Sequence, residues 1–386
     1  MVKNYTSIGD SFMKNFVRLS EVCTISASKA DIEEECAWLL NLDKVESGTG
    51  RVLEHEVVTR EKLNGSIVQF DTGNVLYSKL RPNLNKVVLP EENGYATSEM
   101  LPLRPCESKL TRGYLAEYLR SENFVSWAVG KTAGAKMPRL GTKVLMDKMI
   151  PLPPLEEQHK IVSLFSVVNH VISLRQQQLA KLDELVKARF VEMFASISNK
   201  VNMEDVCKII TDGTHQPPKF TTEGIPFLFV SNIITNKICY DAEKFITEEV
   251  YTELVKRTPI EMGDVLLSTV GSYGHPAVVK SERPFCFQRH IAYLKPDRDR
   301  INSEYLHSAI LSDEVQRQID ERVKGIAQKT LNLSEIRKLQ FPLPSIEKQN
   351  QFAAFVGQTD KSKISIKKSI EQMEILKKAL MQQYFE

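Results

Sequence analysis

The stretch Pro151-Leu152-Pro153-Pro154-Leu155-Glu156-Glu157-Gln158 decides the organisation of this chain, because a copy of it occurs later. The copy is Pro342-Leu343-Pro344-Ser345-Ile346-Glu347-Lys348-Gln349, which places the shared prolines and glutamine at an offset of 191 residues. Self-similarity at a fixed spacing indicates repeated structural units and takes precedence over any single short motif. The sequence therefore predicts a tandem duplication.

The same offset of 191 residues holds over a long stretch on either side. Closer to the start of each copy the spacing shortens, so the insertions fall between about residues 25 and 85 of the first copy. Coincidence of common dipeptides does not give a constant offset over such a length. The further matches are Val87-Val88 with Val278-Val279, Tyr114-Leu115 with Tyr305-Leu306, Phe194 with Phe385 and, at a spacing one residue shorter, Gly73-Asn74-Val75-Leu76 with Gly263-Asp264-Val265-Leu266.

The first part of each copy is predicted to be of mixed α/β structure. Short apolar runs bounded by Gly, Pro and Asn are typical of strands. The predicted strands cover residues 74–77, 86–89, 226–230 and 264–267.

The second part of each copy is predicted to be one long helix of about 40 residues. Prolines mark where each helix begins, since proline fits a first turn but not an interior. Apolar positions then alternate in steps of three and four, which is typical of a coiled-coil seam. We expect the two helices to pack against each other, antiparallel; the alternative is that each stripe packs on its own module. The seams are Phe165, Val168, Ile172, Leu179, Leu182, Val186 and Met193, and Phe352, Val356, Ile366, Ile370, Met373, Leu380 and Tyr384, with polar breaks at Thr359, Lys363 and Lys377.

Bulk composition is that of an ordinary folded protein, with 42% hydrophobic and 26% charged residues. The net charge of +2 means that any DNA-binding charge must be local or shared with other subunits.

Residues 1–7 lack the apolar core of a signal peptide, and no stretch is apolar enough for a membrane span, so we expect a cytoplasmic protein. Six scattered cysteines without a C-x-x-C pair are expected to be reduced and mostly buried.

Motifs of catalysis and cofactor binding are missing or broken. Gly130-Lys131-Thr132 resembles the end of a phosphate loop, but Val125 stands where the first glycine belongs. No G-x-G-x-x-G, H-E-x-x-H or G-x-S-x-G motif occurs. In residues 216–220, Gln and Lys replace the acceptor and the aromatic residue that an amino-methyltransferase needs to hold a flipped base. We therefore predict no catalytic, cofactor-binding or metal-binding residue in this chain.

Three kinds of segment suit DNA. Residues 77–86 mix Arg, Lys and Asn, which contact phosphates and base edges, and their counterpart, residues 268–275, is rich in Gly and hydroxyl groups. Residues 131–148 carry five cations against one acid, and a basic cluster recurs in the second copy. Residues 212–219 form a polar turn, and residues 288–290 are a weaker candidate. An ordinary solvated loop or a solvated basic face is the alternative for each.

The candidate DNA-contacting side chains are those that carry positive charge, amide or hydroxyl groups in these segments. They are Lys79, Arg81, Asn83, Asn85, Lys86, Lys136, Arg139, Lys143, Thr214, His215, Lys219, Thr269, Ser272, Tyr273, Arg289 and Lys329.

Two variable modules, each ended by P-L-P-x-x-E-x-Q and a long helix, resemble the specificity subunit of Type I restriction-modification systems. The run from Gly73 to Pro82 and Asp212-Gly213-Thr214-His215 also resemble target-recognition segments of that family. The resemblance implies that each domain reads one half of a bipartite site in double-stranded DNA, in the major groove. It further implies that the helices set the spacing of the halves and dock two methyltransferase (modification) subunits.

The resemblance also implies where chemistry is done. S-adenosylmethionine, ATP and Mg would bind to the modification and restriction subunits, which methylate adenine and cleave unmodified DNA. This chain would be a non-catalytic subunit. A fused methyltransferase or nuclease, and a coiled-coil scaffold without a DNA role, are the alternatives.

The expected fold is α+β: two similar mixed α/β target-recognition domains separated by two long helices packed as an antiparallel coiled coil. Residues 1–150 would form the first domain, 151–198 the central helical spacer, 199–341 the second domain and 342–386 the C-terminal helical spacer.

Overall fold

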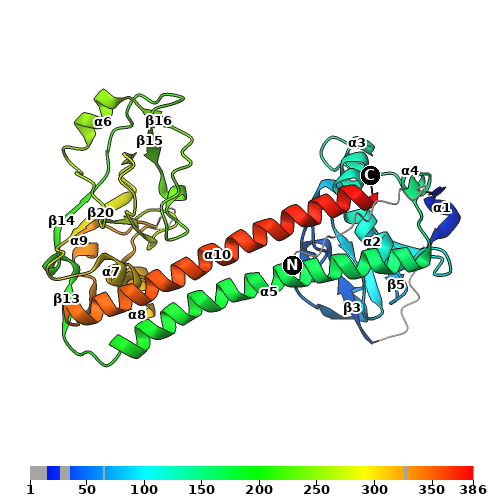
Figure 1. The fold of residues 1–386 in the computed structure, drawn as a ribbon, viewed down its shortest axis with the longest axis horizontal. Helices are drawn as coiled ribbons and strands as arrows, with labels where there is room; N and C mark the ends of the chain where they lie inside the picture. Colours follow the sequence, from blue (N-terminus) through cyan, green and yellow to red (C-terminus); the bar gives the residue numbers. More distant parts are fainter. Residues whose placement is uncertain (1–14, 27–34, 64–65, 326–328, 386) are drawn as a thin grey trace, which may run out of the picture. The chain divides into compact units, whose positions relative to one another are not determined.

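The structure is a computed structural model that describes residues 15–26, 35–63, 66–325 and 329–385. The chain divides into two compact units, Met1–Arg175 with Ser369–Glu386, and Gln176–Lys368, which we call unit 1 and unit 2. The division cuts through two helices of 40 residues each, α5 (Leu155–Phe194) and α10 (Ile346–Phe385), so both units contain part of both (Figure 1). The predicted domain boundaries instead follow the helix ends. Residues 1–7, where a leader peptide would lie, fall outside the described ranges.

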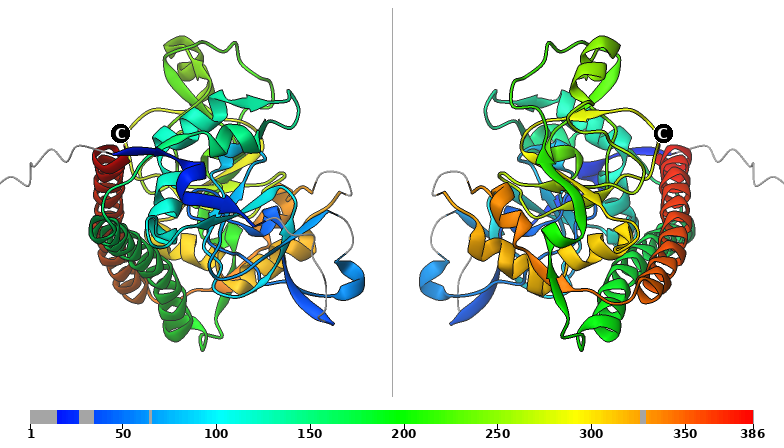
Figure 2. Two further views of the ribbon diagram at one scale, coloured as in Figure 1. Left: turned by 90° about the vertical axis from the view of Figure 1, so that its right-hand side faces the viewer. Right: turned by 90° about the vertical axis from the view of Figure 1, so that its left-hand side faces the viewer.

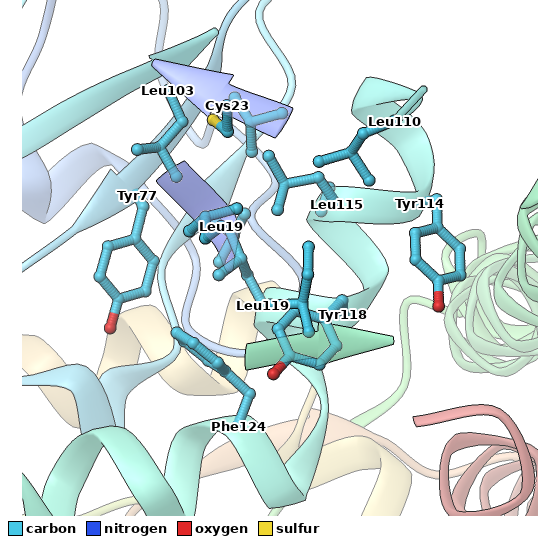
Figure 3. Packing of buried hydrophobic residues seen from close by; sticks show 14 of the residues in the cluster. Leu19, Cys23, Tyr77, Leu103, Leu110, Tyr114, Leu115, Tyr118, Leu119 and Phe124 are labelled. Carbon is cyan, nitrogen blue, oxygen red and sulfur yellow. The ribbon is translucent and has the colours of Figure 1, made fainter. Parts of the chain in front are cut away.

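The main sheet of unit 1 has four antiparallel strands in the order β2 (Cys23–Ile25), β9 (Met100–Pro105), β6 (Val75–Ser78) and β7 (Val87–Val88). The helix α2 (Arg112–Arg120) packs on it, followed by α3 (Glu122–Gly130). Figure 3 shows Leu19 among side chains of this sheet and of α2, in the buried core of unit 1. A second sheet has the order β4 (Val57–Thr59), β3 (Cys36–Leu40), β8 (Gly94–Thr97) and β5 (Ile67–Phe70), with β3 and β8 parallel.

Unit 2 repeats this plan. Its main sheet is β14 (Cys207–Asp212), β20 (Ile291–Pro296), β17 (Val265–Ser268) and β18 (Pro276–Val278), again antiparallel throughout. The helices α7 (Ser303–Ile310) and α8 (Asp313–Arg322) follow in the places of α2 and α3. A smaller sheet holds β16 (Phe245–Ile246), β15 (Ile225–Leu228) and β19 (Cys286–Phe287), with β15 and β19 parallel. The duplication and the four predicted strands are thus confirmed.

A short antiparallel pairing closes each module next to its long helix. In unit 1, β1 (Phe16–Arg18) pairs with β12 (Met149–Pro151), and in unit 2, β13 (Lys200–Asn202) pairs with β21 (Gln340–Pro342). Both pairings include the first proline of the repeated motif, Pro151 or Pro342, and α5 or α10 begins shortly after it, at Leu155 or Ile346. The remaining short elements are α1 (Leu19–Val22), η1 (Leu42–Lys44), η2 (Arg60–Lys62), η3 (Pro82–Leu84), β10 (Thr132–Ala133), β11 (Arg139–Leu140), α4 (Thr142–Met146), η4 (Met203–Asp205), η5 (Val230–Asn232), α6 (Glu248–Leu254) and α9 (Leu333–Arg337).

The repeated glutamine fixes the start of each long helix to its module. Gln158 is fully buried; its Oε1 accepts from Thr111 N at 2.8 Å and its Nε2 donates to Lys109 O at 2.8 Å. Gln349, also fully buried, accepts from Asn302 N at 2.8 Å in the same way. Because a buried amide must have its hydrogen bonds met, these contacts explain why the motif needs glutamine at this position.

The two long helices pack against each other within both units, in antiparallel directions (Figure 1; Figure 2). In unit 1 the ring of Phe165 stacks on that of Phe385, with centroids 5.8 Å apart. In unit 2 the ring of Phe194 meets that of Phe352 at 5.5 Å. The polar seam position Lys363 donates to Asp183 Oδ1 at 2.6 Å, so its charge is paired. The predicted antiparallel packing is confirmed, and packing of each stripe on its own module alone is wrong.

One buried position that is matched in the two copies differs in charge. Asp264, fully buried in unit 2, corresponds to Asn74 in unit 1. Asp264 Oδ2 accepts from the Tyr293 hydroxyl at 2.7 Å and from Glu261 N at 2.8 Å, whereas Oδ1 has no hydrogen-bond partner among the described residues. Burial raises the pKa of Asp264 above its ordinary value, against the lowering effect of the Tyr293 hydrogen bond.

We expect Asp264→Asn to raise the melting temperature at neutral pH. A carboxyl whose pKa is raised by folding weakens folding while it is ionised, and this penalty declines as the pH falls through the folded-state pKa. The advantage of the variant should therefore be largest near pH 7 and shrink in acid. Thermal unfolding of the original protein and of the variant over a pH series measures this difference in stability. A lower melting temperature of the variant at neutral pH would show that the ionised Asp264 carboxylate does not destabilise the fold.

The expectation that the cysteines are mostly buried is wrong for half of them. Cys23 and Cys286 are buried, but Cys36, Cys106 and Cys239 are exposed. Cys36 is the first residue of β3, and Cys106 and Cys239 lie in loops. No helix in the described ranges combines the length and apolarity that crossing a membrane requires. Within the same ranges, no group of three or more His, Cys, Asp or Glu side chains is arranged to hold a metal ion.

Candidate nucleic-acid interface

One end of each main sheet gathers most of the predicted DNA-contacting residues. Because neighbouring strands are antiparallel, β14 and β17 end where β20 begins, and in unit 1 β2 and β6 end where β9 begins. We call this end, with the loops attached to it, the loop end. In unit 1 it comprises residues 79–86, residue 99 and the hairpin 131–140; in unit 2 it comprises residues 213–216, 269–275, 288–290 and 329–331.

Backbone hydrogen bonds join three separate segments at the loop end of unit 2. Thr214 N donates to Phe287 O at 3.2 Å, and Arg289 N donates to Thr214 O at 3.0 Å. Thr269 N donates to His290 O at 2.9 Å. The candidates Thr214, Arg289 and Thr269, far apart in the sequence, are therefore neighbours on a rigid backbone.

Two further candidates of the polar turn have different surroundings. His215 is exposed, and its Nε2 lies 2.9 Å from Asp212 Oδ2; the same carboxylate pairs with Arg257 at 2.5 Å. Lys219 is exposed but precedes Phe220, whose ring packs on Phe227 at 5.1 Å in the smaller sheet. Lys219 therefore belongs to that sheet rather than to the loop end.

The loop of residues 269–275 is held from both sides. Gly271 N donates to Lys329 O at 3.2 Å, and Leu331 N donates to Thr269 O at 2.8 Å. The Tyr273 hydroxyl donates to Asp320 Oδ1 at 3.0 Å, and the Lys329 ammonium lies 6.0 Å from the Tyr273 ring centre. Ser272, beside them, is exposed. These contacts bring Thr269, Ser272, Tyr273 and Lys329 together.

Unit 1 holds its loop in the same way with different side chains. Lys79 N donates to Glu99 O at 3.0 Å, and Arg81 N donates to Pro138 O at 2.8 Å. Leu140 N donates to Lys79 O at 2.9 Å. The structure thus places Lys79 and Arg81 against the hairpin of β10 and β11, which carries Lys136 and Arg139 of the second predicted cluster.

The cations of that cluster fall into two groups. Arg139 forms a forked pair with Glu99, with Nη2 at 2.9 Å and Nε at 3.1 Å from Oε1. Lys148 lies over the Trp127 ring at 4.7 Å, and burial lowers its pKa. Lys136 and Lys143 are exposed and form no ion pair with a described residue. Arg139 and Lys148 thus have internal partners, whereas Lys136 and Lys143 have charges available to a phosphate.

The asparagines after Arg81 are used unequally. Asn83 is exposed in η3. Asn85 Nδ2 donates to Arg120 O at 2.9 Å, and Lys86 Nζ donates to Leu42 O at 2.6 Å. The side chains of Asn85 and Lys86 thus bind the loop to neighbouring elements. Their place in a basic, Asn-rich run had instead predicted contacts with DNA.

Sequence reasoning included His290 only within the weaker candidate segment 288–290 and did not single out Glu99. His290 lies between Arg289 and the start of β20, and burial and the charge of Arg289 lower its pKa, which favours the neutral imidazole. In the neutral form, Nε2 accepts from Arg289 Nε at 3.4 Å, and the Nδ1 N–H can donate to a base edge. Glu99 forms an ion pair with Arg139, although the two residues are 40 positions apart in the sequence. No local sequence pattern predicts a partner at that distance.

The sequence model of the family described as Type I restriction modification DNA specificity domain matches residues 13–184 and again residues 198–375. These matches cover both copies of the repeat. The chain belongs to this family.

Specificity subunits are among its relatives. It is 25% identical over 185 residues to the Type I restriction enzyme EcoDI specificity subunit of Escherichia coli, a match that covers 47% of this chain and 41% of the relative. It is 23% identical to the EcoBI specificity subunit of the same species, covering 64% of this chain and 59% of that protein. It is 22% identical to the MjaVIII specificity subunit of Methanocaldococcus jannaschii, covering 75% and 73%. The chain thus spans about half the length of the two E. coli relatives.

Solved structures share the fold across nearly the whole chain. A chain from a structure described as the basis of complex assembly and conformational transition of the type I R-M system matches with a TM-score of 0.64 at 19% identity, over 96% of this chain and 97% of that one. The S subunit of a Type-I restriction-modification system from M. genitalium matches with a TM-score of 0.60 at 14% identity, over 98% of both chains.

Proposed function

We propose that this chain is the DNA-specificity subunit of a Type I restriction-modification complex, in which each target-recognition domain reads one half of a bipartite site. One observation carries the proposal: the loop ends of the two units share a backbone framework but differ in side chains. A shared framework with exchanged side chains is what two readers of different base sequences require, because base edges are read by specific donors and acceptors.

The chemistry of the loop ends fits duplex DNA. Exposed lysines such as Lys136 in the hairpin, and Lys143 in α4 just after it, suit phosphate contacts, which fix the register without reading sequence. Arg81, Thr214 and Arg289 suit contacts to base edges in the major groove. A net charge of only +2 fits a subunit whose partners supply the remaining phosphate contacts.

The long helices are the proposed docking surface for two methyltransferase subunits. Their outer faces carry large apolar side chains that are widely exposed, among them Val167 and Val191 at 58% and Ile375 at 63%. Exposed apolar stripes of this kind mark protein interfaces. Restriction subunits complete the proposed complex. S-adenosylmethionine, ATP and Mg then belong to the partner subunits, and this chain acts in the cytoplasm without a catalytic site of its own.

Footprinting of the chain assembled with its modification subunits tests the proposal. We expect protection of two short half-sites at a fixed separation. A coiled-coil scaffold without a DNA role would give no sequence-dependent protection, which would overturn the proposal. Appreciable binding of S-adenosylmethionine by the isolated chain would instead favour a fused methyltransferase.

Replacing Lys136 and Lys143 by Ala should weaken DNA binding equally on all sequences. If each lysine contacts one phosphate, the slope of log K against log salt concentration should fall by about 0.9 per residue. Titrations at several salt concentrations measure it. Lys109→Ala is the matched control, because Lys109 is exposed beyond the opposite end of the same sheet, after β9. An unchanged slope in the double variant would place DNA elsewhere.

A further inference from the structure

The backbone of Arg81 is in a conformation that arginine rarely adopts. Its φ is 49° and its ψ is 66°, in the left-handed region. The other described non-glycine residues with positive φ are Asn85 and Asn236, and asparagine tolerates this region better than other non-glycine residues. For arginine the conformation costs energy, since the Cβ approaches the following carbonyl oxygen.

The second copy of the repeat has glycine at the matched position. Gly271 has a φ of 73°, and its backbone N–H is bound to Lys329 O as that of Arg81 is bound to Pro138 O. The preceding residues, Thr269 and Lys79, also make matched hydrogen bonds to both neighbouring segments, at lengths between 2.8 and 3.0 Å. The framework thus imposes a left-handed residue here, and glycine satisfies it without strain.

No contact of the Arg81 side chain with a described residue compensates the backbone strain. Its side chain is exposed and makes no hydrogen bond or ion pair with a described residue. The backbone around it is nevertheless fixed, because Pro82 is buried and Leu84 N donates to Arg81 O at 2.9 Å. Residues held in strained conformations without internal compensation cluster at functional sites.

We propose that Arg81 is a specificity-determining residue, whose guanidinium reads a guanine in the half-site bound by unit 1. This inference rests on the proposed function. Arginine forms a planar fork that matches guanine O6 and N7, and a rigid backbone places that fork before binding. Lysines of the neighbouring hairpin suffice for phosphates, which need no such placement. Unit 2, with Gly271, reads its half-site without this contact.

The decisive variant is Arg81→Gly, which installs the residue of the matched position. In the full chain assembled with its modification subunits, methylation rates are measured on DNA with each base pair of both half-sites varied in turn. We expect discrimination to fall about tenfold or more at one G·C pair in one half-site, with the other half unchanged. The melting temperature of the chain should stay equal or rise, because glycine relieves the strain.

Two controls separate the roles of fork and charge. Arg81→Lys keeps the charge but loses the fork, and should lose most of the discrimination. Lys136→Ala should lower the rate on all sequences and keep the discrimination. Unchanged base preference in Arg81→Gly, or a lower melting temperature, would overturn the inference while the bipartite footprint of the unaltered complex stands. Absence of any sequence-dependent footprint in the unaltered complex would instead contradict the proposed function itself.

Discussion

Exchange of residues 1–150 for the equivalent module of another family member should change the bases recognised in one half of the site only. The loop end of unit 1 is built entirely from this stretch, and its hydrogen bonds join residues 79–81, 99 and 138–140 to one another. The loop end of unit 2 is built from residues 213–331 and should read its half-site as before. Mapping of methylated adenines in cells that carry the hybrid measures the outcome.

The donor module must accept the helices that complete its core. Phe165 of α5 and Phe385 of α10 lie in the same buried cluster as Tyr114 and Tyr118. The donor module should therefore have tyrosine at the positions that correspond to Tyr114 and Tyr118. The reciprocal exchange of residues 199–341 is the control and should change the other half. A hybrid in which both halves changed, or neither, would show that the two modules do not read independently.

Phe385→Ala should destabilise unit 1 by about 3–5 kcal/mol, the usual cost of removing a large buried aromatic side chain. Phe385 is 4% exposed and lies near the chain's end, yet it stacks on Phe165 and meets the rings of Tyr114 and Tyr118 at 5.4 and 5.9 Å. Its loss leaves a cavity in the core of the first module. Hydrogen exchange should show lost protection in α2 and α3, with that of α7 and α8 retained.

The repeat provides the matched variant. Phe194, which aligns with Phe385, is fully buried in unit 2 and meets the ring of Tyr305 at 4.9 Å. Phe194→Ala should therefore cost a similar amount and expose α7 and α8 instead. Ile375→Ala, at a side chain that is 63% exposed, should change stability by less than about 0.5 kcal/mol. We assign Phe385 to the core of unit 1 and Phe194 to the core of unit 2. Loss of protection in unit 2 for Phe385→Ala, or in unit 1 for Phe194→Ala, would contradict this assignment.

The repeat made much of the fold predictable from sequence. The prolines and glutamines of the duplicated motif fixed where both long helices begin, and the alternation of apolar residues gave their pairing. Strands such as β6 and β17 were predicted because short Val- and Leu-rich runs followed glycine turns. These signals are local or periodic, so a single sequence contains them in full.

The use of individual polar side chains was less predictable, because it depends on partners distant in sequence. Arg139 was a DNA candidate from its basic surroundings, but Glu99 pairs with it across the loop end. Asn85 and Lys86 bind backbone carbonyls of other elements. The left-handed backbone of Arg81 has no sequence signal by itself, although its alignment with Gly271 in the repeat could have drawn attention to it.

Identification of every methylated adenine in DNA of a host that expresses this chain with its modification subunits tests the account most directly. We predict one bipartite motif: two short specified segments separated by a constant number of unspecified base pairs, one segment for each module. A single uninterrupted motif, or two segments whose separation varies from site to site, would contradict the reading of DNA by two modules on paired helices.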